Sequence, residues 1–172
     1  MKKQAIIIFI FSIVMIALAF HFQQQLVHFR SLGLFGIFLV NLLGSAMIFL
    51  PAPGIATVVA GGGLYSPFWV GIVAAVGSSI GELTGVLLGR SGKQVFLNQE
   101  AHPLYTATRK LFDRHGGLLI LVVSFIPNPF FDVIGIMAGA MSYSPVRFFC
   151  YVLVGRIARD LLLAYFGHRM FG

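Results

Sequence analysis

The chain has 172 residues, of which 58% are apolar and only 10% are charged, whereas about 25% of the residues of an ordinary soluble domain are charged. With a mean hydropathy of +0.93, this composition excludes a soluble domain and predicts an all-α polytopic membrane protein. The net charge of +7 does not favour nucleic acid as a partner, because the basic residues stand between or at the ends of apolar runs, where membrane orientation and anionic lipid account for them. The single cysteine and the five scattered histidines provide no disulfide and no metal-ligand spacing, so no cofactor and no metal are expected.

The first apolar run, residues 5–22, follows two lysines and is long enough to cross the hydrocarbon core. It is either an N-terminal transmembrane helix or a cleaved signal, since Ala17–Ala19 resembles a cleavage site. Retention is favoured, because the apolar run continues past that site. Residues 1–33 are therefore predicted to form a first transmembrane helix and an outer connection, with the N-terminus in the cytoplasm of a multi-pass inner (plasma) membrane protein.

Two later apolar runs, residues 34–64 and 117–141, are each interrupted by prolines. Proline lacks an N–H and forces the preceding residue out of the α region, so a straight helix cannot pass through either break. Broken backbone within a bilayer must be covered by protein or by a water-filled cavity. Both runs are therefore predicted to be re-entrant helical hairpins. The breaks are at Pro51 and Pro53 in the first run and at Pro127, Asn128 and Pro129 in the second.

Each hairpin is followed by a predicted spanning helix, over residues 67–89 and 145–167. Both helices begin with a Ser-Pro pair, which suits an N-cap followed by the first helical position. The first spanning helix carries glycines at every fourth position, a pattern typical of close helix packing, at Gly77, Gly81, Gly85 and Gly89. Between the two units, residues 93–116 are predicted to form an amphipathic connector on the cytoplasmic face.

Five charged residues lie well inside these membrane segments, where charge is costly enough to indicate function. Arg156 and Asp160 are four residues apart on one predicted helix and can neutralise each other. Such self-neutralisation and an aqueous or interhelical site are both compatible with the pattern. The candidate transport residues are Glu82, Asp132, Arg156, Arg159 and Asp160.

The two hairpin-and-helix units also repeat each other in sequence. An offset of 76 residues relates the proline pair of the first unit to that of the second. After the prolines the offset becomes 78, and it then matches the two Tyr-Ser-Pro runs, three pairs of glycines, and Glu82 with Asp160. Counting membrane crossings places the units in opposite orientations. The chain is thus predicted to contain two inverted repeats, residues 34–92 and 117–168, an arrangement typical of transporters.

At these positions the chain resembles the DedA/VTT superfamily, also called the SNARE-associated Golgi protein domain, over roughly residues 34–167. The similar motifs are Gly-Arg-x-Gly at Gly89–Gly92 and Phe-Ile-Pro at Phe125–Pro127, leading to Ala138-Gly139 and on to Phe148. The resemblance implies a bacterial inner-membrane or eukaryotic organelle protein that moves lipids such as undecaprenyl phosphate or phosphatidylethanolamine between leaflets, in some members with proton-gradient dependence.

The chain departs from the usual DedA pattern at two places. Ser124 occupies the position of an arginine before Phe-Ile-Pro, and Pro129, Phe130 and Phe131 occupy the region of a second arginine. The first hairpin lacks the family's acids, having only Asn41 and Ser45 as polar residues before Pro51. The sequence is therefore most similar to a short branch that contains Pro-Asn-Pro-Phe.

Three functions remain compatible with the sequence. The leading hypothesis is a lipid transporter or scramblase with membrane lipids as partners, in which the two arginines bind phosphate. The alternatives are a proton- or ion-coupled carrier of a small solute and a non-transporting structural or assembly protein. No catalytic Ser-His-Asp, Cys-His or metal constellation is present, so an enzyme is least favoured. Homo-oligomerisation and proton coupling are left open.

Overall fold

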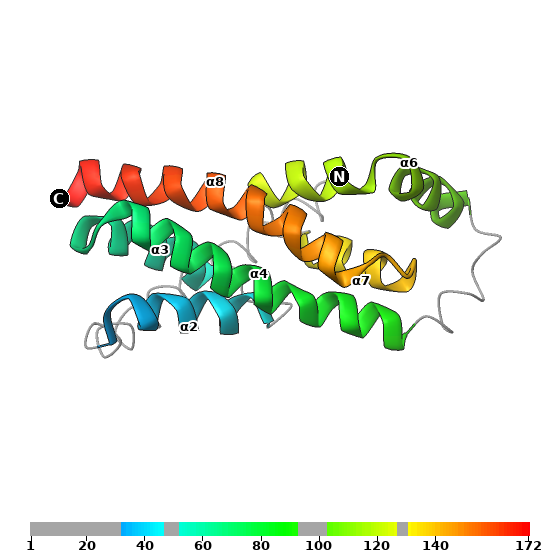
Figure 1. The fold of residues 1–172 in the computed structure, drawn as a ribbon, viewed down its shortest axis with the longest axis horizontal. Coiled ribbons are helices and arrows are strands. Elements are labelled where there is room, and N and C mark those ends of the chain that lie inside the picture. Colours follow the sequence, from blue (N-terminus) through cyan, green and yellow to red (C-terminus); the bar gives the residue numbers. More distant parts are fainter. Residues whose placement is uncertain (1–31, 47–51, 93–102, 127–130) are drawn as a thin grey trace, which may run out of the picture.

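The computed structural model describes residues 32–46, 52–92, 103–126 and 131–172. In these residues the chain forms helices joined by turns, with no strand (Figure 1). The helices are α2 (Gly33–Ala46), α3 (Ala52–Leu64), α4 (Pro67–Ser91), α6 (Pro103–Phe125), α7 (Phe131–Ala140) and α8 (Pro145–Phe171). The all-helical prediction is confirmed for the described segments, whereas the predicted N-terminal transmembrane helix falls outside them.

The two long helices begin where the sequence predicts, with Pro67 and Pro145 at the first helical position. Proline suits this position because the N–H it lacks would have no intrahelical partner there. The two preceding serines differ. The side chain of Ser144 accepts a hydrogen bond from the backbone N–H of Arg147 at 3.5 Å, whereas Ser66 makes no side-chain capping hydrogen bond. Ser66 is the N-cap residue of α4, as predicted, although its side chain makes no capping hydrogen bond.

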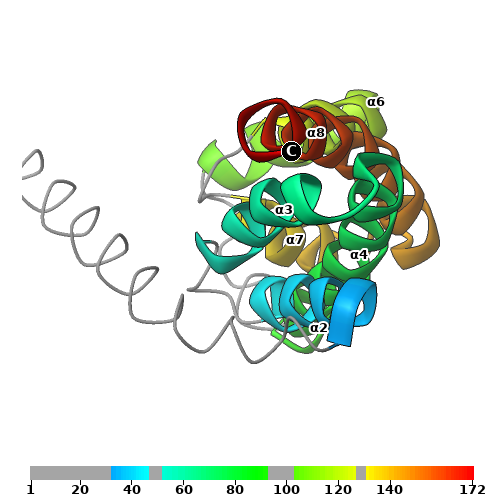
Figure 2. The same cartoon turned by 90° about the vertical axis from the view of Figure 1, so that its left-hand side faces the viewer.

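The long helices α4 and α8 run in opposite directions and pack on each other through the middle of the molecule (Figure 1). α2 packs on α4, and α6 packs on α8. The short helices cross over, because α3 packs mainly on α8 and α7 packs mainly on α4. Seen end-on, α2 and α6 lie at opposite edges with α3 and α7 between them (Figure 2). The second helix of each predicted hairpin thus rests on the long helix of the other predicted unit.

Glycines allow these crossed contacts to be close. A Cβ atom at Gly62 of α3 would overlap the carbonyl oxygen of Ala164 on α8, and a Cβ atom at Gly139 of α7 would overlap that of Val86 on α4. Glycines on the long helices make the same kind of contact. A Cβ atom at Gly167 of α8 would overlap the carbonyl oxygen of Val59 on α3, and one at Gly89 of α4 would overlap that of Ile136 on α7. Each of these two glycine contacts between α3 and α8 therefore has a counterpart between α4 and α7.

The glycine face of α4 packs within the chain. Gly77 and Gly81 lie against the backbone of α2, at Phe38 and Leu42, while Gly89 lies against α7. The prediction that these glycines serve helix packing is confirmed, and both partners are helices of the same chain. Of the described helices, only α4 combines the length and the hydropathy needed to cross a membrane; α2, α7 and residues 54–64 of α3 are apolar but shorter.

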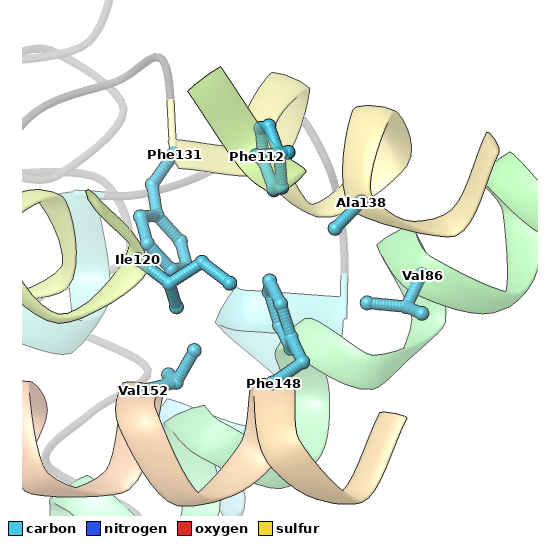
Figure 3. Packing of buried hydrophobic residues seen from close by; sticks show 7 residues of the cluster. All are labelled: Val86, Phe112, Ile120, Phe131, Ala138, Phe148 and Val152. Carbon is cyan, nitrogen blue, oxygen red and sulfur yellow. The ribbon is translucent and has the colours of Figure 1, made fainter. Parts of the chain in front are cut away.

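The described part of the predicted connector and the first arm of the second hairpin are two helical segments of α6 that meet at a kink, close to the boundary expected from the sequence. The helix bends at His115, whose backbone is non-helical (φ −137°, ψ 20°). Just before the bend, Phe112 is buried and packs edge-on against Tyr143. Apolar side chains from α4, α6, α7 and α8 meet in this region (Figure 3): Val86, Phe112, Ile120, Phe131, Ala138, Phe148 and Val152. This cluster fixes α7 between α4 and α8.

Candidate functional site

The packing of α4 on α8 brings two opposite charges together in the interior. Arg156 of α8 donates a hydrogen bond from Nη2 to Oε1 of Glu82 on α4, forming a buried ion pair. Only 3% of Glu82 and 9% of Arg156 is exposed. Glu82 belongs to the first predicted repeat and Arg156 to the second, so the ion pair joins the two units.

A second buried ion pair lies one turn further along α8. Arg159 contacts Oδ1 of Asp160 with Nε at 2.8 Å and with Nη2 at 2.7 Å. Asp160 is fully buried and Arg159 is 7% exposed. The expected pairing of Arg156 with Asp160 is therefore wrong. Each arginine has a different acid, because the antiparallel packing of α4 places Glu82 within reach of Arg156.

Asp132 approaches the same cluster from α7. It lies in the first turn of that helix, where an acid interacts favourably with the helix dipole. Its carboxyl group interacts with the carboxyl group of Glu82 and with the Arg156 guanidinium. Asp132 is only partly buried, so it is the most accessible charged residue of the cluster. A second acid, on a different helix, thus lies close to the ion pair between Glu82 and Arg156.

The apolar cluster borders the charges directly. The Arg156 guanidinium carbon lies 5.2 Å from the centre of the Phe131 ring, within the range of a cation–π interaction. Phe131 is buried and also packs against Phe148. The ring therefore forms one wall of the charged site and excludes water from that side.

Three buried polar atoms near the ion pairs have no hydrogen-bond partner within the described part of the chain: Ser79 Oγ, Arg156 Nε and Asp160 Oδ2. Ser79 lies on α4, one turn before Glu82. Buried polar atoms without partners are uncommon, because each costs the free energy of losing its water. Their presence beside two ion pairs favours a site where polar groups from outside the chain bind.

One apolar hollow lies on α2 and α4, away from the charged cluster. It has a volume of about 400 Å³ and is lined by the side chains of Leu34, Phe35, Phe38 and Val73. None of these residues belongs to the charged cluster, whose two ion pairs are buried. The structure therefore brings together all five predicted site residues, with both ion pairs buried and Asp132 partly exposed.

The predicted hairpin breaks are mostly outside the described residues. Pro51, Pro127, Asn128 and Pro129 cannot be placed, while Pro53 is the second residue of α3. Within the described segments, no group of three or more histidine, cysteine, aspartate or glutamate side chains is arranged to hold a metal ion.

Sequence reasoning missed a polar contact that holds α2 to α3. Asn41 is 2% exposed and donates from Nδ2 to the Ile37 carbonyl at 2.8 Å and to Thr57 Oγ1 at 3.3 Å. Thr57 in turn donates to the Gly54 carbonyl at 2.7 Å. The signal in the sequence was a lone asparagine within an apolar run, which needs a partner when it is buried.

Comparison with known proteins gives one match. A family model described as VTT domain matches residues 50–169, a range that includes every residue of the charged cluster. No curated protein and no solved structure matches the chain.

Proposed function

The chain belongs to the VTT domain family, whose members are membrane-associated, and from this premise we propose that it moves lipid between the two leaflets of a membrane. Membership confirms the resemblance drawn from the sequence motifs. The proposal names phospholipid or polyprenyl phosphate as the substrate class. It also takes the protein to be a multi-pass protein of the inner (plasma) membrane with a cytoplasmic N-terminus.

The proposed architecture consists of two inverted units. The first contains α2, α3 and α4, and the second contains the part of α6 after His115, α7 and α8. Three features support it: the antiparallel α4 and α8, the crossed packing of α3 and α7, and the matching glycine contacts. The offset of 78 residues that relates Glu82 to Asp160 also relates Gly89 to Gly167 and Val86 to Ala164. In this scheme each pair of helices before a spanning helix is a re-entrant hairpin.

The observation that carries the proposal is the buried ion pair between Glu82 and Arg156. A buried ion pair adds little net stability, because the free energy lost on removing two charges from water offsets their attraction. Within a bilayer such charges are costly and mark substrate or ion pathways. A guanidinium group also binds phosphate through paired hydrogen bonds. A lipid phosphate could thus take the place of Glu82 at Arg156 without leaving the arginine unpaired.

Burial of the cluster implies movement during transport. Because Arg156 is 9% exposed and Asp160 is fully buried, a headgroup reaches them only after the two units separate along α4 and α8. Asp132, which is partly exposed and interacts with Arg156, is the first charged residue such a headgroup would meet. The structure corresponds to a closed state in this proposal.

A leaflet-exchange assay tests the proposal. The purified protein is placed in liposomes that contain a fluorescent phospholipid or polyprenyl phosphate, and exchange is followed with and without a pH gradient. We expect Arg156→Ala to reduce the exchange rate at least about tenfold, the effect of losing a charged hydrogen bond worth about 1.5–3 kcal/mol. Arg169→Ala, which changes an exposed arginine at the end of the same helix, is the matched control and is expected to retain the rate. Normal exchange by a folded Arg156→Ala protein would contradict the assignment.

One observation favours a second candidate, an ion- or proton-coupled carrier of a small solute. Asp160 is fully buried and its Oδ2 atom has no partner among the described residues, which suits the binding of a proton or a cation. This candidate predicts solute flux that follows a pH gradient, and no lipid exchange in the assay above. Exchange that needs no gradient would instead support passive lipid scrambling.

A further inference from the structure

A second polar group of residues lies at the end of the molecule where α4 ends and α8 begins (Figure 1). Arg90, in the last turn of α4, donates from Nη2 to the carbonyl oxygen of Tyr143 at 3.1 Å. Tyr143 lies in the turn before α8, and Arg147 and Tyr151 follow in the first two turns of that helix. Both arginines and Tyr151 are exposed. This group, called here the tyrosine–arginine site, is separate from the buried charged cluster.

The two tyrosine rings are held in place by a pair of glycines in α6. A Cβ atom at Gly116 would lie 3.2 Å from Cε2 of Tyr143, and one at Gly117 would overlap the ring of Tyr151 and lie 2.8 Å from its hydroxyl oxygen. The other side of Tyr143 packs edge-on against Phe112. These glycines directly follow the bend at His115. The rings are therefore supported by the backbone of α6 and cannot move freely.

Arg147 stands between the tyrosines at a spacing of four residues on either side, which places it on the same side of the helix as Tyr151. Arg147 and the two tyrosines also interact electrostatically. Burial and the neighbouring Tyr151 raise the pKa of Tyr143, whereas Arg147 lowers it. No carboxylate of the described residues forms an ion pair with Arg90 or Arg147. The site thus presents positive charge and phenol hydroxyl groups without a described acidic partner.

We propose that the tyrosine–arginine site binds the phosphate headgroup of an anionic phospholipid at the membrane surface. Arginine matches the geometry of phosphate oxygens, and a tyrosine hydroxyl donates a further hydrogen bond to them. Tyrosine is also favoured at the level of lipid headgroups, since its ring is apolar and its tip is polar. Tyr151 is the seventh residue of α8, about 9 Å from its start, so it lies near that level.

This site differs from the proposed transport site in position. Arg147 and Arg156 are nine residues apart on α8, which places them on opposite sides of the helix at 100° per residue. Arg147 faces outward, whereas Arg156 is buried against α4. Lipid binding at Arg147 therefore requires no opening of the two units and does not depend on transport.

Lipid binding can be measured by native mass spectrometry of the intact protein in detergent, titrated with phosphatidylglycerol or with zwitterionic phosphatidylcholine. We expect phosphatidylglycerol to bind more tightly than phosphatidylcholine. Arg147→Gln is expected to weaken phosphatidylglycerol binding about tenfold, as for the loss of charged hydrogen bonds, and Tyr151→Phe to weaken it about threefold. Tyr151→Phe keeps the ring that packs on Gly117, so its fold is preserved.

The control is Arg169→Gln, which removes the same charge from an exposed position at the other end of α8. It is expected to leave binding at the tyrosine–arginine site unchanged. Equal weakening by Arg147→Gln and Arg169→Gln would show only diffuse attraction between a basic protein and anionic lipid, and would overturn the proposal. Equal affinity for the two lipids, or unchanged binding by folded Arg147→Gln, would also overturn it.

Discussion

Of the charged residues described, Arg156 interacts with the most members of the charged cluster and of the apolar wall beside it. It forms an ion pair with Glu82, interacts with Asp132 and lies over the ring of Phe131. Its Nε atom nevertheless has no partner among the described residues. Removing an arginine from water costs several kcal/mol, and the present contacts leave part of that cost unmet. A binding role explains this residue better than a purely structural one.

The coupling between Glu82 and Arg156 can be tested with a double-mutant cycle. We expect Glu82→Gln and Arg156→Gln each to destabilise the protein by about 3–5 kcal/mol, because each leaves a buried charge without its partner. The double variant is expected to lose at least about 1 kcal/mol less than the sum, as residues in direct contact do. Reversible unfolding in mixed micelles provides the free energies.

The matched control for this cycle combines Glu82→Gln with Arg159→Gln. Arg159 is paired with Asp160 and acts on Glu82 only as a weaker electrostatic neighbour than Arg156, so these two changes are expected to couple less strongly than Glu82→Gln and Arg156→Gln. Coupling of equal size in both cycles would mean that the charges interact as one diffuse group, without a specific pair between Glu82 and Arg156.

The identity of the charged residues could be predicted from the sequence, but their partners could not. Charges within apolar runs are visible because they are costly in a bilayer. Which acid meets which arginine depends on the register of α4 against α8, and residues 74 apart in sequence carry no local signal of contact. The local spacing of Arg156 and Asp160 favoured the wrong pair for this reason.

Glycines of α4 allow this helix to pack closely, and two of them face α7. Gly89 lies against the Ile136 carbonyl of α7, where a Cβ atom would overlap backbone. Gly85 also faces α7, but a Cβ atom there would lie no closer than 3.7 Å to any neighbour. The two glycines occupy the same face of one helix and differ in available space, so they form a natural comparison.

We expect Gly89→Ala to destabilise the protein by about 1–3 kcal/mol, because backbone atoms cannot move aside as a flexible side chain can. Gly85→Ala is expected to be neutral or to stabilise by up to about 1 kcal/mol, since alanine favours helix and its methyl group fits. Thermal unfolding in detergent measures both. A loss of stability with Gly85→Ala as large as that with Gly89→Ala would contradict the packing described here.

At the level of elements, the starts of the long helices and the boundary near residue 116 were predictable. Pro67 and Pro145 mark helix starts through the fixed backbone angle of proline. The change from a polar to an apolar pattern near residue 116 marks the place where the two helical segments of α6 meet, because the non-helical backbone at His115 lies one residue before it.

Over the whole molecule, the repeat in the sequence is consistent with the packing, but the crossing of α3 and α7 was not foreseen. Each of these short helices packs on the long helix that belongs to the other predicted unit. Sequence similarity relates equivalent residues and carries no information on which copy they contact. In the proposed movement, the two units separate only if α3 leaves α8, α7 leaves α4 and α4 leaves α8, which makes these contacts a suitable place to test it.

Cross-linking the units and measuring lipid exchange tests the central claim most directly. A Cβ atom at Gly63 would lie 2.8 Å from Cβ of Phe171, joining α3 to α8. One at Gly81 would lie 2.8 Å from Cβ of Ser45 and would overlap the Leu42 carbonyl oxygen, joining α4 to α2 within one unit. Both pairs are closer than the Cβ separation of about 3.5–4.5 Å in a disulfide, so the helices must move apart slightly at each place, and each variant is first shown to be folded. Cysteine pairs are introduced at each place in a Cys150→Ser background, which removes the single native cysteine.

We expect oxidation of the Gly63→Cys/Phe171→Cys pair to stop leaflet exchange in liposomes and reduction to restore it, because transport requires the units to separate. The Gly81→Cys/Ser45→Cys pair is expected to exchange lipid at the same rate in both states, since it joins helices of one unit. Undiminished exchange by the fully cross-linked Gly63→Cys/Phe171→Cys protein would contradict a transport route that opens between the two units.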